Sequence, residues 1–324
     1  MRIRRKPLPG YVRWAAGLAA LGKAAPGKLD ELWVVEDCFY ASGMASAAVA
    51  LAVTDPLQIG LGIMPAVVRN PAFSAMEIAT LARMYPGRFL PGIGHGMADW
   101  MRQIGAFPKS QLAALGETTE AVRRLLAGEE VTMHGSHVHL DRVKLEFPPT
   151  QPPPITLGVR GPRSLHVSGR SADGTLLAEL SSPAYVRWAR QEIRVGQQEA
   201  RREDQPHRVT VYALLAVDDD AAAARTRMRK RIAPWLVYGQ EDYTRALGIE
   251  AEVNEMRMNG GVARLEAEMK DDWIDQMAAV GTASDCAASV QRLAEAGADS
   301  VVLVTEQLGE DGLADVEAVL SALG

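Results

Sequence analysis

Two adjacent carboxylates, Glu36 and Asp37, follow directly after the apolar run 32–35. A buried strand that ends there places at least one of the two carboxylates at the strand tip. Two ionised carboxylates in a desolvated site repel each other, so one of them would retain its proton and serve as a proton donor. The alternative is that the acid only caps the N-terminus of the next helix. The neighbouring Cys38 is better explained as a small packing residue.

Glycines mark the ends of two further apolar runs. Residues 59–64 contain Gly62, and glycine within a strand indicates either a bulge or the close approach of a ligand to the backbone. A planar ring could lie against Gly62, although barrel curvature alone explains a glycine there equally well. Residues 87–96 end in Gly94-His95-Gly96, which lacks the Lys-Ser/Thr of a phosphate-binding Walker loop. His95 could donate a hydrogen bond or a proton from this loop.

A third junction carries positive charge. Arg160-Gly161-Pro162-Arg163 follows the run 155–159 and opens a helix. Free backbone N–H groups at a helix start, together with two guanidinium groups, indicate an anion site. After the run 174–178, Ala178 and Glu179 could pack against a cofactor.

The elements that must position these residues alternate regularly along the chain. Short β-rich runs are separated by helical stretches such as 72–84, 111–126 and 284–296. The candidate strands are residues 2–8, 31–35, 57–64, 89–93, 155–159, 174–178, 209–217 and 300–304. Eight strands with intervening helices predict an α/β fold of the (β/α)8 TIM-barrel type, whose functional residues lie at the C-terminal strand ends.

Two segments interrupt this alternation. Residues 131–147 predict a hairpin arm followed by a Pro-rich linker. Residues 232–277, helical and rich in Met and Trp, are too long for a barrel connection and predict an insertion between strands 7 and 8. It would lie over the barrel mouth or form an oligomer contact. No boundary divides the chain, so we expect one domain over residues 1–324.

Composition excludes several classes of protein. The chain is 48% hydrophobic with a net charge of -5, which does not favour nucleic acid binding. The basic start, residues 2–6, is interpreted as a solvated segment rather than a site for an anionic partner. Two cysteines favour a reducing, cytoplasmic compartment, and the apolar stretch 45–53 is too short to cross a membrane. His134, His137 and His139 lie in the predicted arm, and we expect no metal site there.

These junctions, in this order, resemble those of the luciferase-like (LLM class) flavin- and deazaflavin-dependent oxidoreductases. Within that family the chain looks most like the methylenetetrahydromethanopterin reductases. The resemblance covers nearly the whole chain. The matching stretches are 32–37, 59–63, 69–71, 78–81, 87–96, 161–165, 172–174 and 280–282.

The resemblance implies a barrel with a flavin or deazaflavin ring at its mouth. It also implies a non-proline cis peptide beneath the ring, at Gly62–Ile63, and a cofactor phosphate near Gly161. The cofactor-contacting residues expected on this basis are Gly62, Ile63, Met64, Gly94, Gly96, Arg160, Gly161, Pro162, Arg163, Ala178 and Glu179.

The chain departs from the reductase pattern at two positions. Glu36-Asp37 stands where those reductases have Asp-His, and Lys6 aligns with a glutamate proposed there as a proton donor. If the reaction is related, Glu36, Asp37 or His95 must supply the proton. We therefore expect hydride transfer with coenzyme F420 to or from a small organic substrate, with a reduced folate or pterin as the specific hypothesis (a methylenetetrahydrofolate reductase-like reaction).

Two alternatives remain open. One is an FMN-dependent monooxygenase of the same superfamily, which would need a flavin reductase as partner. The other is a flavin-binding barrel without catalysis. Members of the family often pair through barrel helices, so a homodimer is expected.

Overall fold

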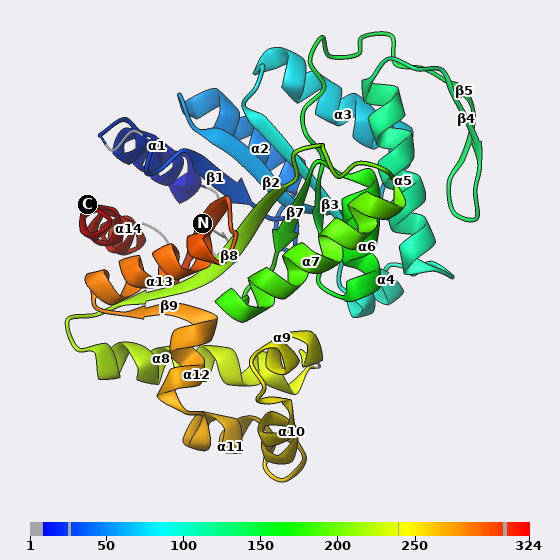
Figure 1. Ribbon diagram of the computed structural model, residues 1–324. Helices are drawn as coiled ribbons and strands as arrows, with labels where there is room; N and C mark the ends of the chain where they lie inside the picture. The colour runs from blue at the N-terminus through cyan, green and yellow to red at the C-terminus, as the bar shows by residue number, and fades with distance from the viewer. Residues whose placement is uncertain (1–8, 25–26, 239, 307–309) are drawn as a thin grey trace. The chain divides into compact units, whose positions relative to one another are not determined.

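The computed structural model describes residues 9–24, 27–238, 240–306 and 310–324 (Figure 1). They fall into two compact units. The larger unit contains the chain up to Leu176 together with Glu192–Arg208, and the smaller unit contains Leu177–Gln191 and Val209–Gly324. That the two units form one domain remains a prediction.

The larger unit is built on five parallel strands in the order β1-β2-β3-β6-β7. Their bounds are β1 Glu31–Val34, β2 Gln58–Pro65, β3 Phe89–Gly94, β6 Thr156–Gly158 and β7 Gly174–Leu177. Every residue of β3 and of β7 is buried, as strands covered on both faces must be. The predicted first strand, residues 2–8, and Lys6 lie outside the described residues.

Helices alternate with these strands. Their bounds are α1 Pro9–Ala24, α2 Gly43–Val53, α3 Pro71–Met84, α4 Ala98–Gln103, α5 Gln111–Leu126, α6 Pro162–Ser171 and α7 Pro183–Glu199. Local sequence explains where several begin. The Asn70 side chain accepts the Ala72 N–H ahead of Pro71 at the start of α3, and Ser110 caps α5. The predicted helices at 72–84 and 111–126 are thus confirmed.

The predicted arm is the antiparallel hairpin β4 (Val131–His134) and β5 (His139–Val143), which projects beyond α5 (Figure 1). Glu117 of α5 fastens its turn by accepting hydrogen bonds from the backbone N–H groups of Ser136, His137 and Val138 at 2.8–2.9 Å. Burial raises the pKa of Glu117, but these hydrogen bonds outweigh it and lower the pKa to about 2. A Cβ on Gly135 would lie 2.3 Å from this carboxylate, so the turn requires glycine.

A pair of glycines lets α6 and the end of α7 approach closely. A Cβ added to Gly169 would lie 2.1 Å from the Ile193 carbonyl oxygen. A Cβ added to Gly196 would lie 2.2 Å from the His166 carbonyl oxygen. The two backbones therefore pass at a separation that no larger residue permits.

The smaller unit contains β8 Arg208–Val217, β9 Ala278–Gly281 and β10 Ser300–Thr305, with β8 pairing in parallel with both others. Its helices are α8 Ala221–Val237, α9 Glu241–Ala246, α10 Glu250–Met258, α11 Gly261–Glu268, α12 Asp271–Met277, α13 Ala283–Glu295 and α14 Glu310–Ala322. The sequence interpretation missed β9, since Ala-Ala-Val-Gly follows a helix without a break and is poor in strand-forming residues. The helical insertion therefore precedes β9 rather than the last strand.

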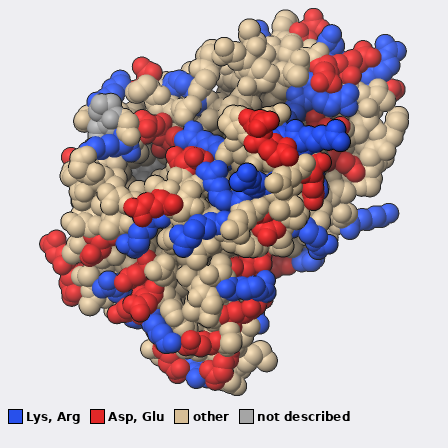
Figure 2. Space-filling view, viewed as in Figure 1, with Lys and Arg blue, Asp and Glu red and all other residues tan. Residues whose placement is uncertain are grey.

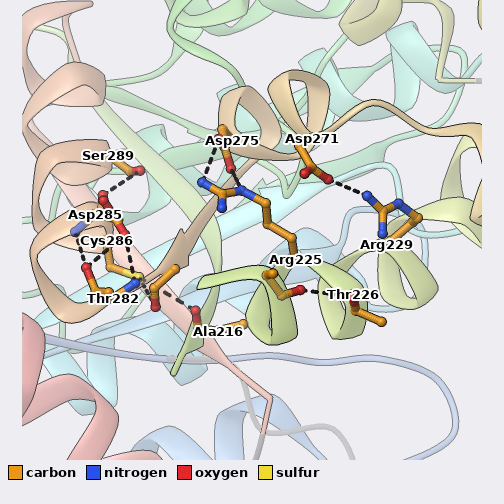
Figure 3. Close-up of polar contacts among 12 residues, drawn as sticks. Ala216, Arg225, Thr226, Arg229, Asp271, Asp275, Thr282, Asp285, Cys286 and Ser289 are labelled. Atoms are coloured by element: carbon orange, nitrogen blue, oxygen red, sulfur yellow. Dashed lines mark hydrogen bonds and ion pairs between the residues drawn. The ribbon is translucent and has the colours of Figure 1, made fainter. Parts of the chain in front are cut away.

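Ion pairs join the end of the insertion to the first half of α8, which precedes the insertion (Figure 3). Arg225 of α8 makes two hydrogen bonds to Asp275 of α12, at 2.8 and 3.0 Å, and Arg229 pairs with Asp271. Beyond β9, Thr282 and Asp285 form a capping box at the start of α13. Burial raises the pKa of the adjacent Cys286 thiol to about 12. The Met and Trp residues Met256, Met269, Trp273 and Met277 are buried, as packing residues are.

Candidate active site

The end of β2 is irregular. The peptide bond Gly62–Ile63 is cis, as the resemblance implied. The register of β2 against β3 shifts between Leu61 and Met64, so the strand is irregular around Gly62, where a bulge was one of the expectations.

Glycines on the two neighbouring strands make room for Ile63. A Cβ on Gly158 would lie 2.4 Å from Ile63 Cγ2, and one on Gly94 would lie 2.9 Å from Ile63 Cδ1. On β3, Gly92 is required because its Cβ would meet the Leu61 carbonyl oxygen at 2.2 Å. A Cβ on Gly94 would also lie 2.8 Å from the Gly158 carbonyl oxygen, and the expected contact of Gly94 with a cofactor stays a prediction. Together these residues form a close-packed floor at the strand ends.

Both carboxylate oxygens of Glu36 accept hydrogen bonds. Its carboxylate accepts hydrogen bonds from Arg69 at 2.5 Å to Oε1 and 2.9 Å to Oε2, and from the Gly43 N–H at 2.9 Å. Gly43 is the first residue of α2, so the carboxylate also lies at a helix N-terminus, where negative charge is stabilised. The Glu36 side chain is only 10% exposed. This matches the alternative considered for the acid, a helix-capping role.

The residues after Glu36 form a tight turn. The Asp37 carbonyl oxygen accepts the Tyr40 N–H at 2.9 Å, and the Cys38–Phe39 peptide is also cis. The Cys38 pKa is raised by burial and by the charges of Glu36 and Asp37, which disfavours a thiolate. Phe39 and Tyr40 are exposed, at 65% and 56%. The role of Asp37 remains a prediction.

His95 connects the end of β3 to the start of α6. Its Nε2 lies 2.9 Å from Ser164 Oγ, and the ring also hydrogen-bonds to the backbone of Gln111. Burial lowers the His95 pKa, and the nearby positive charge of Arg160 lowers it further. The imidazole is therefore neutral near pH 7 and can accept a proton.

The start of α6 offers backbone donors beside this histidine. Gly161 is the N-cap and has no side chain to cap the helix, while Pro162 occupies the first turn. Gly96, with φ of 72°, turns the chain after His95 and would place a Cβ 3.0 Å from Pro65. Arg160 is exposed. A helix N-terminus of this kind is suited to an anion such as a phosphate.

Three further residues were expected to contact the cofactor: Arg163, Ala178 and Glu179. Arg163 lines a cavity between α5 and α6 on the outer helical layer of the larger unit. Ala178 and Glu179 belong to the smaller unit, where Glu179 is buried and the Ser181 hydroxyl donates to the Ala178 carbonyl oxygen at 2.6 Å. Their contact with a cofactor stays a prediction.

Three residues that contribute to this site were not assigned a role from the sequence. Arg69 and Ser164 are the side-chain partners of Glu36 and His95, and Gly158 accommodates Ile63. Each of these residues is distant in sequence from its partner, so the spacing of residues in the sequence does not predict the contact. Within the described residues, no group of three or more His, Cys, Asp or Glu side chains is placed to bind a metal. No described helix is long and apolar enough to cross a bilayer.

Comparison with known proteins gives consistent matches. The family described as luciferase-like monooxygenase matches residues 6–300. The 5,10-methylenetetrahydromethanopterin reductase of Methanolobus tindarius is 28% identical over 279 residues, covering 84% of this chain and 85% of the relative.

Two solved structures share the fold. The coenzyme F420-dependent tetrahydromethanopterin reductase of Methanopyrus kandleri superposes with a TM-score of 0.80 at 22% identity, over 100% of this chain and 96% of that one. The FMN-bound oxygenating constituent of 3,6-diketocamphane monooxygenase from Pseudomonas putida gives 0.70 at 16% identity, over 98% and 91%. The fold is thus the luciferase-like TIM barrel, as predicted. Since the family match spans most of the chain, this protein belongs to the luciferase-like monooxygenase family.

Proposed function

We propose that the chain is an oxidoreductase that uses the deazaflavin coenzyme F420 to transfer hydride to or from a small organic substrate. The observation that carries the proposal is the grouping of three features in the larger unit. These are the floor formed by Ile63 with Gly94 and Gly158, the His95–Ser164 contact, and the open N-terminus of α6 at Gly161. The similarity to the pterin reductase of Methanolobus tindarius supports the choice of substrate, and the likeness to the coenzyme F420-dependent reductase of Methanopyrus kandleri supports the choice of coenzyme.

The residues present fit such a coenzyme. A flat ring needs a close-packed surface without projecting polar groups, and the Ile63 floor provides one. A phosphate needs backbone donors and positive charge, which Gly161 and Arg160 provide. When bound, the deazaflavin supplies the hydride chemistry at its C5 atom.

The chain's own contribution is to place a proton. A neutral His95 can take the proton that leaves a substrate O–H or N–H group, and in the opposite direction it can return that proton. Ser164 fixes the orientation of the ring through the Nε2–Oγ contact. Glu36 and Arg69 hold the loop after β1 against α2 rather than exchanging protons.

The test is titration of the purified protein with F420 and, separately, with FMN, followed by turnover on reduced pterins and folates. We expect saturable F420 binding that Gly158→Ala weakens, with circular dichroism confirming that the variant is folded. Tight FMN binding without F420 binding would overturn the coenzyme assignment. Tight binding of either without turnover on any substrate would favour the barrel that lacks catalysis.

The FMN monooxygenase alternative is supported by the similarity in fold to the FMN-bound monooxygenase of Pseudomonas putida. In that case the reduced flavin would have to arrive from a separate reductase. Oxygen consumption by the protein with reduced FMN, absent with reduced F420, would establish this alternative.

We also propose that the chain forms a homodimer through α2 and α3. Exposed apolar side chains occur on both helices: Val49, Val53, Phe73, Met76 and Met84. Large contiguous apolar patches on a protein surface mark interaction sites. Sedimentation velocity is expected to give a dimer, and Phe73→Glu with Met76→Glu to give a monomer. A wild-type protein that sediments as a monomer at micromolar concentration would rule out this assembly.

A further inference from the structure

The outer face of the larger unit contains a cavity of about 850 Å³ between α5, α6 and the segment after α7. This volume is in the range of small-molecule sites. Its lining is strongly cationic, with a single lining carboxylate, Glu120. The basic residues are Arg123, Arg124, Arg163, His166, Arg170 and Arg202.

At one end of this cavity two guanidinium groups, those of Arg123 and Arg202, lie close together. Arg123 and Arg202 both pair with Asp173, whose carboxylate also accepts the Ile155 N–H at 2.9 Å. One carboxylate thus balances two guanidinium groups. Burial lowers the Arg202 pKa, and the charge of Arg123 lowers it further. An additional negative charge at this point would relieve the repulsion.

Arg202 is also held in place by contacts that fix its direction. It donates to the Arg170 carbonyl oxygen at 2.8 Å and to Gln205 Oε1 at 2.7 Å, and its side chain is only 14% exposed. A guanidinium fixed in this way is ready to bind without a further loss of side-chain entropy.

Arg163 also lines the cavity and supplies a further positive charge there. Within the described part of the chain, its side chain has neither an ion pair nor a hydrogen bond, whereas Arg124 pairs with Glu129 and Arg170 with Glu199. Arg163 lies in the first turn of α6, where the helix dipole also favours negative charge. Leu112, Ala113 and Val167 add apolar lining to the same cavity.

We propose that this cavity is a second binding site, separate from the strand-end site, for a small molecule that carries two or more phosphate or carboxylate groups. One anionic group lies between Arg202 and Arg123, and another meets Arg163. Figure 2 shows acidic and basic side chains interspersed over the face that it draws. The site does not depend on which coenzyme the barrel binds.

The experiment is isothermal titration calorimetry of the full chain with pyrophosphate and, in a second arm, with citrate at constant ionic strength. The two arms separate a preference for phosphate from one for carboxylate. The Arg163→Gln/Arg170→Gln variant should weaken binding about tenfold or more, because it removes the charge-assisted contact of Arg163 and a second positive charge, that of Arg170, from the cavity lining. Both side chains are exposed, and circular dichroism checks that this variant is folded.

A matched control removes the same charge elsewhere. Arg102→Gln/Arg142→Gln alters two exposed arginines outside the cavity and should leave the affinity unchanged within about twofold. Arg160→Gln, at the strand-end site, should also leave it unchanged. No measurable heat with either probe overturns the proposal. Equal weakening by both double variants, or loss of binding in Arg160→Gln alone, overturns it as well, since the binding would then be nonspecific or at the other site.

Discussion

Glu36 and His95 were both candidates for proton transfer, and their surroundings differ sharply. Glu36 accepts two hydrogen bonds from Arg69 and one from the backbone at the start of α2. His95 is a half-buried neutral ring whose side-chain partner is the hydroxyl of Ser164. A carboxylate saturated with donors maintains structure, whereas a neutral imidazole can still change its protonation. The comparison shows that the donors around a titratable group decide its role, more than its position at a strand end.

The largest expected effect comes from His95→Asn. If His95 handles the proton, turnover with F420 falls about 100-fold or more, because general acid–base catalysis contributes on that scale. The free energy of unfolding should change by less than about 1 kcal/mol. Single-turnover kinetics and urea unfolding measure the two quantities. Turnover within twofold of wild type would remove His95 from the mechanism.

Arg69→Ala should have the opposite effect, lowering the stability of the fold more than the turnover. It leaves the Glu36 carboxylate, which is only 10% exposed, without its ionic partner. We expect a loss of about 2 kcal/mol in the free energy of unfolding, between the values typical of surface and buried ion pairs. Arg102→Ala, which breaks an exposed pair with Asp99, is the control and should cost less than about 0.5 kcal/mol. If Arg69→Ala abolished turnover at unchanged stability, Glu36 would regain a direct catalytic role.

Glu117 is a second carboxylate saturated with donors and tests the same rule away from the site. Its folded pKa of about 2 is below the usual unfolded value of about 4.3. The stability it contributes is therefore present above about pH 4.3 and is lost as the pH falls toward 2. Glu117→Gln should remove about 1 kcal/mol of hairpin stability at pH 7.

Hydrogen exchange at residues 136–138 measures this contribution. The wild type should lose amide protection between pH 4.3 and 2 relative to a reference amide in α5. Glu117→Gln should show no such acid-dependent loss. An identical acid profile in both proteins would mean that another group controls the turn.

The smallest effect concerns the pH dependence of His95. Its pKa is lowered on folding from a usual value near 6.5, so the unfolded chain binds the proton more readily. The wild type is then fully stable above about pH 6.5 and loses stability as the pH falls below that value. In His95→Asn this loss should be smaller, as urea unfolding at pH 7.5 and 5.5 would show. A steeper acid loss in the variant would contradict a half-buried neutral ring.

Local patterns in the sequence predicted most of the elements. The strands β2, β3, β8 and β10, the hairpin 131–147 and the starts of α3 and α5 depend on nearby residues, such as Asn70 before Pro71. The irregular end of β2 was also anticipated, through Gly62 and the family resemblance. By contrast, β9 has only four residues and little strand propensity of its own, so its pairing with β8 depends on tertiary structure.

The candidate site was harder to predict, because its contacts join distant positions. Glu36 and Arg69 are 33 residues apart, and His95 and Ser164 are 69 apart. Arg163 was expected at the cofactor as part of an anion site at the start of a helix. In the structure it lines the cavity between α5 and α6, and its contact with a cofactor stays a prediction.

The close passage of α6 and α7 at Gly169 and Gly196 has a consequence for how this protein can vary. Adding a single methyl group at either position would force the facing backbones of α6 and α7 apart, since the Cβ would lie 2.1 or 2.2 Å from a carbonyl oxygen. Arg202, beyond α7, donates to the Arg170 carbonyl oxygen of α6, so this contact depends on the same spacing. Two residues that carry no charge thus bear on how the arginines around the cavity are arranged.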